Sequence, residues 1–195
     1  MKKLSIILAS VLVFGVSISA VAMVHPDNTQ SSAKHDIKVG IPSYSLVGVS
    51  STSGIELKPG VSTVAGEGLN FSASSASDES VWLNYSSILS GETSNSISVS
   101  MTGDNLPSGV SIELIASADA GKGKGETGTA KQTKITLNGQ DQDIVTGIGN
   151  CYTGTGSGSG HKLTYSLKMS DEGVNYKKLT SGSFTTTVTY TITDN

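Results

Sequence analysis

The chain has no arginine, a single cysteine and only four prolines among its 195 residues. Proteins that bind phosphates or read base edges rely on arginine forks and clustered basic side chains. Here the lysines are scattered and the formal net charge is −3, which argues against nucleic-acid binding. One cysteine cannot form an internal disulfide, so stability has to come from burial of apolar surface. We expect Cys151 to be a small buried side chain, with a bridge between two chains as the alternative.

The chain also lacks a second apolar run as long as the one near its N-terminus. Two lysines precede the apolar segment 4–16, and Ala20-Val21-Ala22 then offers small residues for cleavage. That order predicts a signal peptide over residues 1–22, because the apolar run is shorter than the ~20 residues of a membrane-spanning helix. We therefore expect export to the periplasm, the cell surface or the extracellular space, with no transmembrane span in the mature chain. Residues 23–36 are polar and aperiodic and predict a flexible leader.

Short alternating segments rich in glycine, serine and threonine are abundant. In the clearest one, residues 184–192, apolar side chains such as Val188 alternate with threonines, which is typical of a half-buried β-strand. About nine such segments recur at spacings of roughly 8–15 residues, with no amphipathic helix between them. This pattern predicts an all-β fold, a two-sheet antiparallel β-sandwich of immunoglobulin-like or pilin-like type, formed by residues 37–195 as a single domain.

Several local features carry more specific expectations. The alternating segments 97–101 and 110–114 are expected to form consecutive, paired antiparallel strands. Trp82 is the only tryptophan, and its large apolar area predicts a place in the core. The glycine-rich segments 121–128 and 154–160 predict a mobile hairpin tip and a flexible loop.

Residues suited to catalysis or metal binding are scarce. Two of the three histidines lie in the leader, so Cys151 and His161 form the one nucleophile–base pair that the sequence offers. The glycines between them give no reason to expect fixed geometry. Asp141 and Asp143 fit either a calcium-binding loop or solvated turn acids, and the second interpretation is favoured. We expect no catalytic residues, no metal, no cofactor and no enzymatic activity.

Two segments resemble exported bacterial fimbrial subunits of the alternate chaperone–usher kind, and similar uncharacterised secreted bacterial β-sandwich proteins. One is His35-Asp-Ile-Lys-Val-Gly-Ile-Pro-Ser-Tyr-Ser-Leu46, which alternates around a proline. The other is the C-terminal alternating strand with Tyr190 near its end. The absence of a paired disulfide fits the alternate class and departs from the common one.

The resemblance implies that the leader strand is donated to a neighbouring subunit and that the terminal strand accepts a partner strand. Such β-augmentation uses ladder hydrogen bonds for affinity and alternate side chains for specificity. The resemblance implies donor side chains at Ile37, Val39 and Ile41, and acceptor side chains at Phe184, Val188 and Tyr190.

These observations predict an exported, non-enzymatic structural or adhesive surface protein, in its most specific form a fimbrial subunit that assembles by β-strand donation. Its expected partners are like subunits or an exported assembly partner that binds by β-augmentation. The alternative is a self-contained secreted β-sandwich module that binds a carbohydrate or another ligand.

Overall fold

The computed structural model describes residues 32–194. The predicted signal peptide and most of the predicted leader lie outside these residues. Residues 32–40 have no regular secondary structure and belong to a unit separate from the compact one that starts at Ile41. The architecture below is that of the compact unit. Among the described residues, no helix combines the length and the apolar character needed to cross a membrane.

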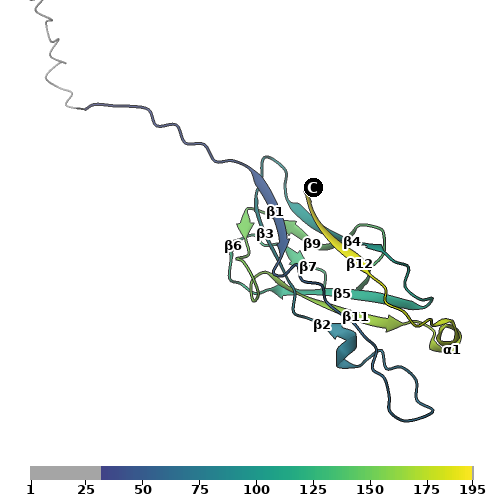
Figure 1. Cartoon of the computed structure of the whole chain (residues 1–195). Coiled ribbons are helices and arrows are strands. Elements are labelled where there is room, and N and C mark those ends of the chain that lie inside the picture. Colours follow the sequence, from purple (N-terminus) through teal and green to yellow (C-terminus); the bar gives the residue numbers. More distant parts are fainter. Residues whose placement is uncertain (1–31, 195) are drawn as a thin grey trace, which may run out of the picture. The chain divides into compact units, whose positions relative to one another are not determined.

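Two antiparallel sheets form the compact unit, which confirms the predicted all-β sandwich (Figure 1). In the larger sheet β3, β11 and β5 follow one another, with β1 along the free edge of β3 and β8 along that of β5. The short strands β10 and β6 continue from β3, and β2 pairs with β11. The strands of this sheet are β1 (Tyr44–Val49), β2 (Ser77–Asp78), β3 (Trp82–Ile88), β5 (Val110–Asp119), β6 (Lys124–Gly125), β8 (Ile135–Thr136), β10 (Cys151–Tyr152) and β11 (His161–Met169).

The smaller sheet has the order β12-β4-β9-β7. Its strands are β4 (Asn95–Gly103), β7 (Thr129–Ala130), β9 (Gln142–Ile148) and β12 (Thr186–Asp194). The helical elements are three short turns, the 3-10 turns η1 (Ser74–Ala76) and η2 (Tyr176–Lys178) and the single α-helical turn α1 (Glu172–Asn175).

The expected pairing of segments 97–101 and 110–114 is wrong, although both are strands. They lie in β4 and β5, which belong to different sheets. The connection at 104–109 crosses from one layer to the other, and each strand then pairs with a strand distant in sequence, β12 for β4 and β11 for β5. Alternation shows which side chains share a face, but it does not identify the neighbouring strand.

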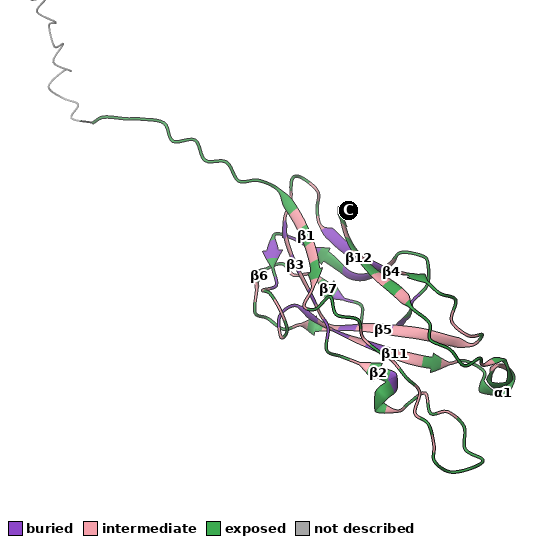
Figure 2. Cartoon of the chain, viewed as in Figure 1, coloured by how far each residue is buried: buried purple, intermediate pink, exposed green. Residues whose placement is uncertain are grey.

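The core lies between the two sheets, and alternate residues of the longer strands are buried there (Figure 2). In β12 the inward side chains Val188, Tyr190 and Ile192 pack against this core and the threonines between them are exposed, as the alternation predicts. Phe184 is different, because the strand starts at Thr186 and the Phe184 side chain remains 38% exposed. The most deeply buried apolar side chains are Leu83, Ile97, Val99, Leu114, Ile144, Val145, Ile148 and Leu163.

Trp82 does not occupy the core position expected for it. Along β3 the side chains alternate between half-buried and buried, and Leu83 and Tyr85 take the inward positions. Trp82, one residue before Leu83, therefore lies on the outer face, where it is half-buried. The two-residue period of the strand outweighs the large apolar area of the indole.

Both glycine-rich segments make defined contacts in the structure, and their mobility stays a prediction. Strand β6 pairs with β10, and a Cβ at Gly125 would collide with the Asn150 carbonyl, so glycine permits this close approach. The loop at 154–160 is held by Asn84, whose amide donates to the Ser159 carbonyl (2.6 Å) and accepts from the backbone N–H of Gly156 (2.9 Å).

Candidate interaction surface

One side of the sandwich carries two long strand edges next to each other. Strand β1 pairs only with β3, and β12 pairs only with β4, within the described part of the chain. Although the two strands belong to different sheets, their Cα atoms approach within 8 Å. A free edge exposes unpaired backbone N–H and C=O groups, which can pair with another chain.

The β12 edge lacks the features that usually prevent such pairing. Its nine residues pair with β4 in continuous register, from Thr186 opposite Gly103 to Asp194 opposite Asn95, without a bulge. The strand contains no proline and no charged side chain before Asp194. Proteins usually protect edges by short strands, bulges, proline or charge. The free edge of β12 therefore lacks the usual protection against an added strand.

Strand β1 is held less firmly than the long interior strands β3, β4, β5 and β11. None of its six residues is buried, whereas β3, β4, β5 and β11 each contain fully buried side chains. Its inward side chains Val47 and Val49 pack against the core, while Leu46 on the outer face is 63% exposed. Backbone pairing to β3 and two partly buried valines therefore supply most of its attachment.

A buried asparagine joins the strands on this side. Asn95, at the start of β4, is fully buried. With its amide oriented to match its neighbours, Oδ1 accepts from the hydroxyls of Ser45 (2.6 Å) and Ser87 (3.1 Å), and Nδ2 donates to Asp194 Oδ1 (3.1 Å) and the Ser94 carbonyl (3.2 Å). One side chain thus links β1, β3, β4 and β12. A buried amide that lacks hydrogen-bond partners costs free energy. Movement of either edge strand would remove a partner of Asn95, so this residue couples β1 and β12.

The predicted donor side chains are exposed and have no strand around them. Ile37, Val39 and Ile41 are 76%, 78% and 80% exposed, and no strand precedes Tyr44 within residues 32–43. Three apolar side chains alternating in an extended polar segment would each gain about 1.5–3 kcal/mol from full burial. Residues 37–41 thus present an exposed row of alternating apolar side chains.

Of the predicted acceptor side chains, Val188 and Tyr190 already face the core, and Phe184 lies outside the strand. The Tyr190 hydroxyl lies 2.6 Å from that of Tyr165, and burial raises the pKa of both phenols above the usual value. What β12 offers to a partner is therefore its backbone edge, with Phe184 at one end. Pattern reasoning found the strand but could not show which of its groups remain free.

Cys151 and His161 are both buried, but their surroundings do not suit nucleophilic catalysis. His161 Nδ1 donates to the Ser117 carbonyl (2.8 Å), and Nε2 lies 2.7 Å from the Tyr85 hydroxyl. Tyr85 also donates to the Thr127 carbonyl. Both ring nitrogens are thus engaged by groups other than the thiol, and burial raises the pKa of Cys151, which disfavours a thiolate. This cluster is a polar part of the core.

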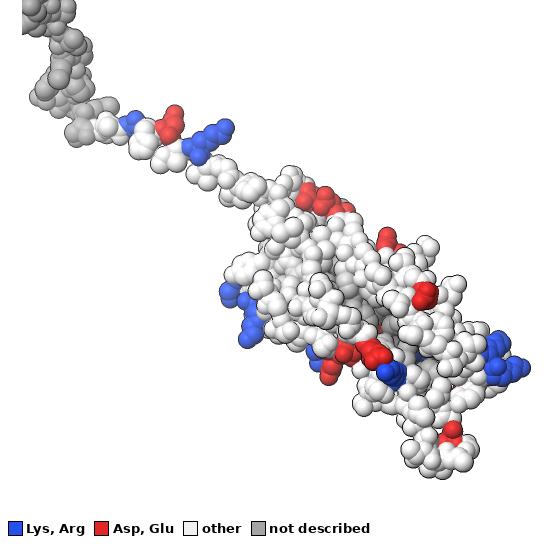
Figure 3. All heavy atoms as spheres, viewed as in Figure 1, with Lys and Arg blue, Asp and Glu red and all other residues white. Residues whose placement is uncertain are grey.

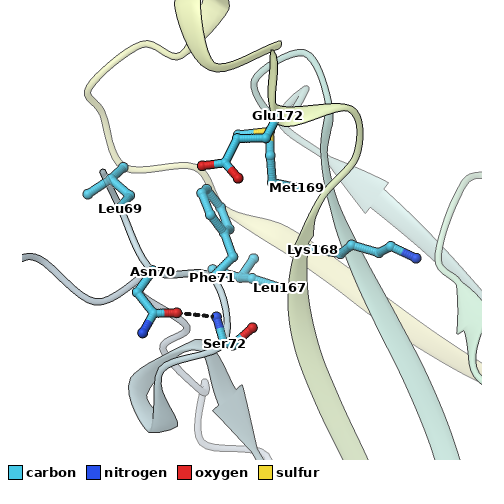
Figure 4. A pocket seen from close by; sticks show the side chains of 8 residues that line it. All are labelled: Leu69, Asn70, Phe71, Ser72, Leu167, Lys168, Met169 and Glu172. Atoms are coloured by element: carbon cyan, nitrogen blue, oxygen red, sulfur yellow. Dashed lines mark hydrogen bonds between the residues drawn. The ribbon is translucent and has the colours of Figure 1, made fainter. Parts of the chain in front are cut away.

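Two surface hollows in the described residues are further candidate sites, each with a volume of about 280 Å³. In the first, Figure 4 shows Phe71 between Leu69 and Leu167, with the Glu172 carboxylate beside it and Lys168 directed away. The second lies on the outer face of the larger sheet, and its lining residues are Leu46, Val47, Gly48, Asn84, Tyr85, Ser86, Tyr152, Gly154 and Thr155.

The second hollow is bordered by the aromatic ring of Tyr152 and by the aliphatic side chain of Leu46. Leu46 and Tyr152 both stand opposite Ser86, on its two sides, and Tyr152 is 51% exposed. Because serine is small, the space between the two larger side chains stays open. No group of three or more His, Cys, Asp or Glu side chains in residues 32–194 is arranged to hold a metal ion. No protein-family model, curated protein or solved structure matches the chain.

Proposed function

We propose that this chain is an exported, non-enzymatic structural or adhesive surface protein that assembles by β-strand donation. The observation that carries the proposal is the nine-residue edge of β12, uncharged up to its last residue Asp194, in a chain that also has an exposed alternating apolar segment at 37–41. Proteins normally protect an edge of this kind, so an unprotected edge favours pairing with a partner strand. The signal-peptide pattern of residues 1–22 supports export.

The leader of one copy supplies the strand that the β12 edge of another copy accepts. Backbone ladder bonds give affinity, and Ile37, Val39 and Ile41 pack beside the inward row of β12 that contains Val188 and Tyr190. Lys38, between two of the donor side chains, would point to the outer face and remain solvated. This arrangement resembles assembly in fimbriae of the alternate chaperone–usher kind, which is the most specific form of the proposal.

The donor half of the proposal is tested by the triple substitution Ile37→Ser, Val39→Ser and Ile41→Ser. We expect the wild-type protein to form multimers that grow with concentration, measured by light scattering after size-exclusion chromatography. The triple variant should stay monomeric with unchanged thermal stability, since these side chains are exposed in the monomer. The matched control is Lys38→Ser, which keeps the apolar alternation and should assemble normally. Multimers formed by the triple variant would disprove donation by this leader.

The acceptor half is tested by placing charge on the β12 edge. Thr189→Lys and Thr191→Lys change exposed positions and leave the inward row intact. Lysine on an edge strand opposes pairing with a further strand, so this variant should remain monomeric. Thr146→Lys, an exposed position on β9 away from the edge, is the matched control and should still assemble. Equal loss of assembly in both variants would point to net charge rather than to the edge.

The second hollow favours the alternative, a carbohydrate- or ligand-binding module. An exposed tyrosine beside an apolar wall is a surface on which a sugar ring can stack, and three of the six tyrosines are exposed rather than buried. Under this alternative, Tyr152→Ala abolishes binding in a glycan-array screen of the wild-type protein, whereas Tyr176→Ala, also exposed, does not. The absence of any bound glycan would remove the alternative and leave strand donation as the proposal.

A further inference from the structure

We infer that β1 itself passes between copies, so that residues 44–49 of one chain occupy the β3 edge of a second copy of the same chain. This inference rests on the proposed assembly by strand donation and specifies its partner and its donated strand. The donated segment then extends from the leader through β1, because residues 37–43 lead directly into Tyr44. Four observations support it. Strand β1 is weakly attached, its contacts can form again with a second copy, an exposed hinge follows it, and the β12 edge lies beside it.

The attachment of β1 is almost entirely of a kind that a second copy can reproduce. The ladder runs from Tyr44 opposite Ile88 to Val49 opposite Leu83. Beyond the strand, Ser50 and Trp82 exchange two bonds, one from the Ser50 N–H to the Trp82 carbonyl (2.8 Å) and one from the Trp82 N–H to the Ser50 hydroxyl (2.9 Å). All of these bonds form again when an identical β1 enters, so exchange exposes no new polar group.

The segment that can act as a hinge, residues 51–54, follows Ser50 directly. Residues 51–54 are exposed and contain one internal side-chain hydrogen bond, from the Ser53 N–H to the Ser51 hydroxyl (3.2 Å). Only beyond them is the chain held again, by Ile55 packed against the core and by the Lys58 N–H bonded to the Ser75 carbonyl (2.7 Å). Four extended residues span roughly 13–14 Å, enough to carry β1 away from its own sheet.

Departure of β1 would join the two free edges into one groove. The β3 edge at Leu83–Ile88 and the β12 edge would then border the same space, because β1 lies within 8 Å of β12 now. Asn95 would present its amide to this groove, ready to accept from Ser45 of an incoming strand. The groove therefore selects a strand with serine at that position and valines facing inward, as the chain's own β1 has.

The test uses cysteine pairs in a Cys151→Ala background, which removes the only native thiol. Leu46 and Ser86 stand opposite each other in the ladder, on the outer face. Opposite residues in antiparallel strands have Cα atoms about 4.5–5.5 Å apart, within the range that a disulfide spans. One preparation carries Leu46→Cys, the other Ser86→Cys, and the two are refolded together and oxidised. Non-reducing electrophoresis then shows whether β1 of one chain lies on β3 of another.

We expect a covalent dimer in this mixture and none in the control mixture of Thr189→Cys with Ser100→Cys, a pair opposite each other in the β12–β4 ladder. The double variant Leu46→Cys/Ser86→Cys, oxidised at high dilution, should give an intrachain bond and shows that the pair can react. Multimers without a covalent dimer overturn β1 exchange and leave donation by the leader intact. A mixture that neither assembles nor cross-links overturns both proposals. Equal dimer in both mixtures indicates random collision and also overturns the exchange.

Discussion

The side of the sandwich that carries β1 and β12 differs from the side that carries β7 and β8. The edges on the first side are six and nine residues long, whereas β7 and β8 have two residues each. Lys131 and Lys134 flank the two short strands, but β1 has no charged residue and β12 only Asp194. The same chain therefore protects the edges on one side by short strands and charge, and leaves those on the other side open.

The difference extends to the interactions that hold each side together. Near β8, Glu113 forms ion pairs with Lys168 (2.9 Å) and Lys134 (3.5 Å). The open side depends instead on the uncharged amide of Asn95, and none of the ion pairs in the described residues involves β1 or β12. In the view of Figure 3, most of the visible surface is uncharged, with acidic side chains scattered over it and lysines mainly toward its margins. Charge at an edge opposes pairing with a further strand, and the side of β1 and β12 carries only Asp194.

The largest effect should come from Asn95→Ala, which removes the link on the open side. The hydroxyls of Ser45 and Ser87 and the Asp194 carboxylate would each lose a partner, and a buried group left unpaired costs about 1–3 kcal/mol. We expect the free energy of unfolding to fall by about 2–3 kcal/mol in chemical denaturation. Hydrogen exchange should accelerate in both β1 and β12. The control is Asn138→Ala, in the exposed turn between β8 and β9. It should lower the free energy of unfolding by less than half as much.

Tyr190→Phe should have the next largest effect, and a pH dependence distinguishes it. Burial raises the pKa of Tyr190 in the folded state, so its contribution is complete below the unfolded value of about 10 and is lost as the pH rises beyond it. At neutral pH the variant should lose about 1 kcal/mol, because the Tyr165 hydroxyl loses its partner. Above pH 10 the wild-type protein should lose stability more steeply than the variant. If stability falls with pH at the same rate in Tyr190→Phe and in the wild type, burial does not raise the pKa of this phenol. The control is Tyr152→Phe, at an exposed position.

Much of the fold could be predicted because strand alternation is local. The closing strand, its inward row and its threonine face follow from residues that adjoin one another, and the structure confirms them from Thr186 onward but not at Phe184. Burial of Cys151 is confirmed as well. The predictions were wrong where the answer depended on distant residues. Trp82 is only half-buried because Leu83 and Tyr85 occupy the inward face of β3. No local property of the tryptophan predicts which face of the strand is inward.

The candidate surface depends on sheet order, which is a long-range property. Alternation at 37–41 and 184–192 indicates apolar faces, but whether an edge is free depends on which strands pair with β3 and β4. Asn95 illustrates the limit, because an asparagine at the start of a strand resembles a turn residue in sequence. Only the meeting of three other strands at its side chain shows its structural importance.

Glu113→Gln tests the charged side, with a smaller effect. The hydrogen bond from Lys168 lowers the pKa of this carboxyl, and the charges of Lys168 and Lys134 add to the effect. Its contribution is present above the unfolded value of about 4.3 and is lost as the pH falls through the lowered folded value. We expect a loss of about 0.5–1 kcal/mol at pH 7, since both lysines are half-exposed, and no difference from wild type in strong acid. Glu56→Gln, in a fully solvated pair with Lys58, should change nothing measurable.

The double variant Lys131→Thr/Lys134→Thr should have the smallest effect on stability and the most specific effect on association. It removes the charges that flank β7 and β8 and costs roughly 0.5 kcal/mol, the lost surface pair of Lys134 with Glu113. If charge is what keeps this side closed, the variant gains a second contact and forms branched or larger multimers in light scattering. If two-residue strands alone suffice, association stays as in wild type. The combination with Thr189→Lys and Thr191→Lys separates the cases, because any multimer that remains must use the newly opened side.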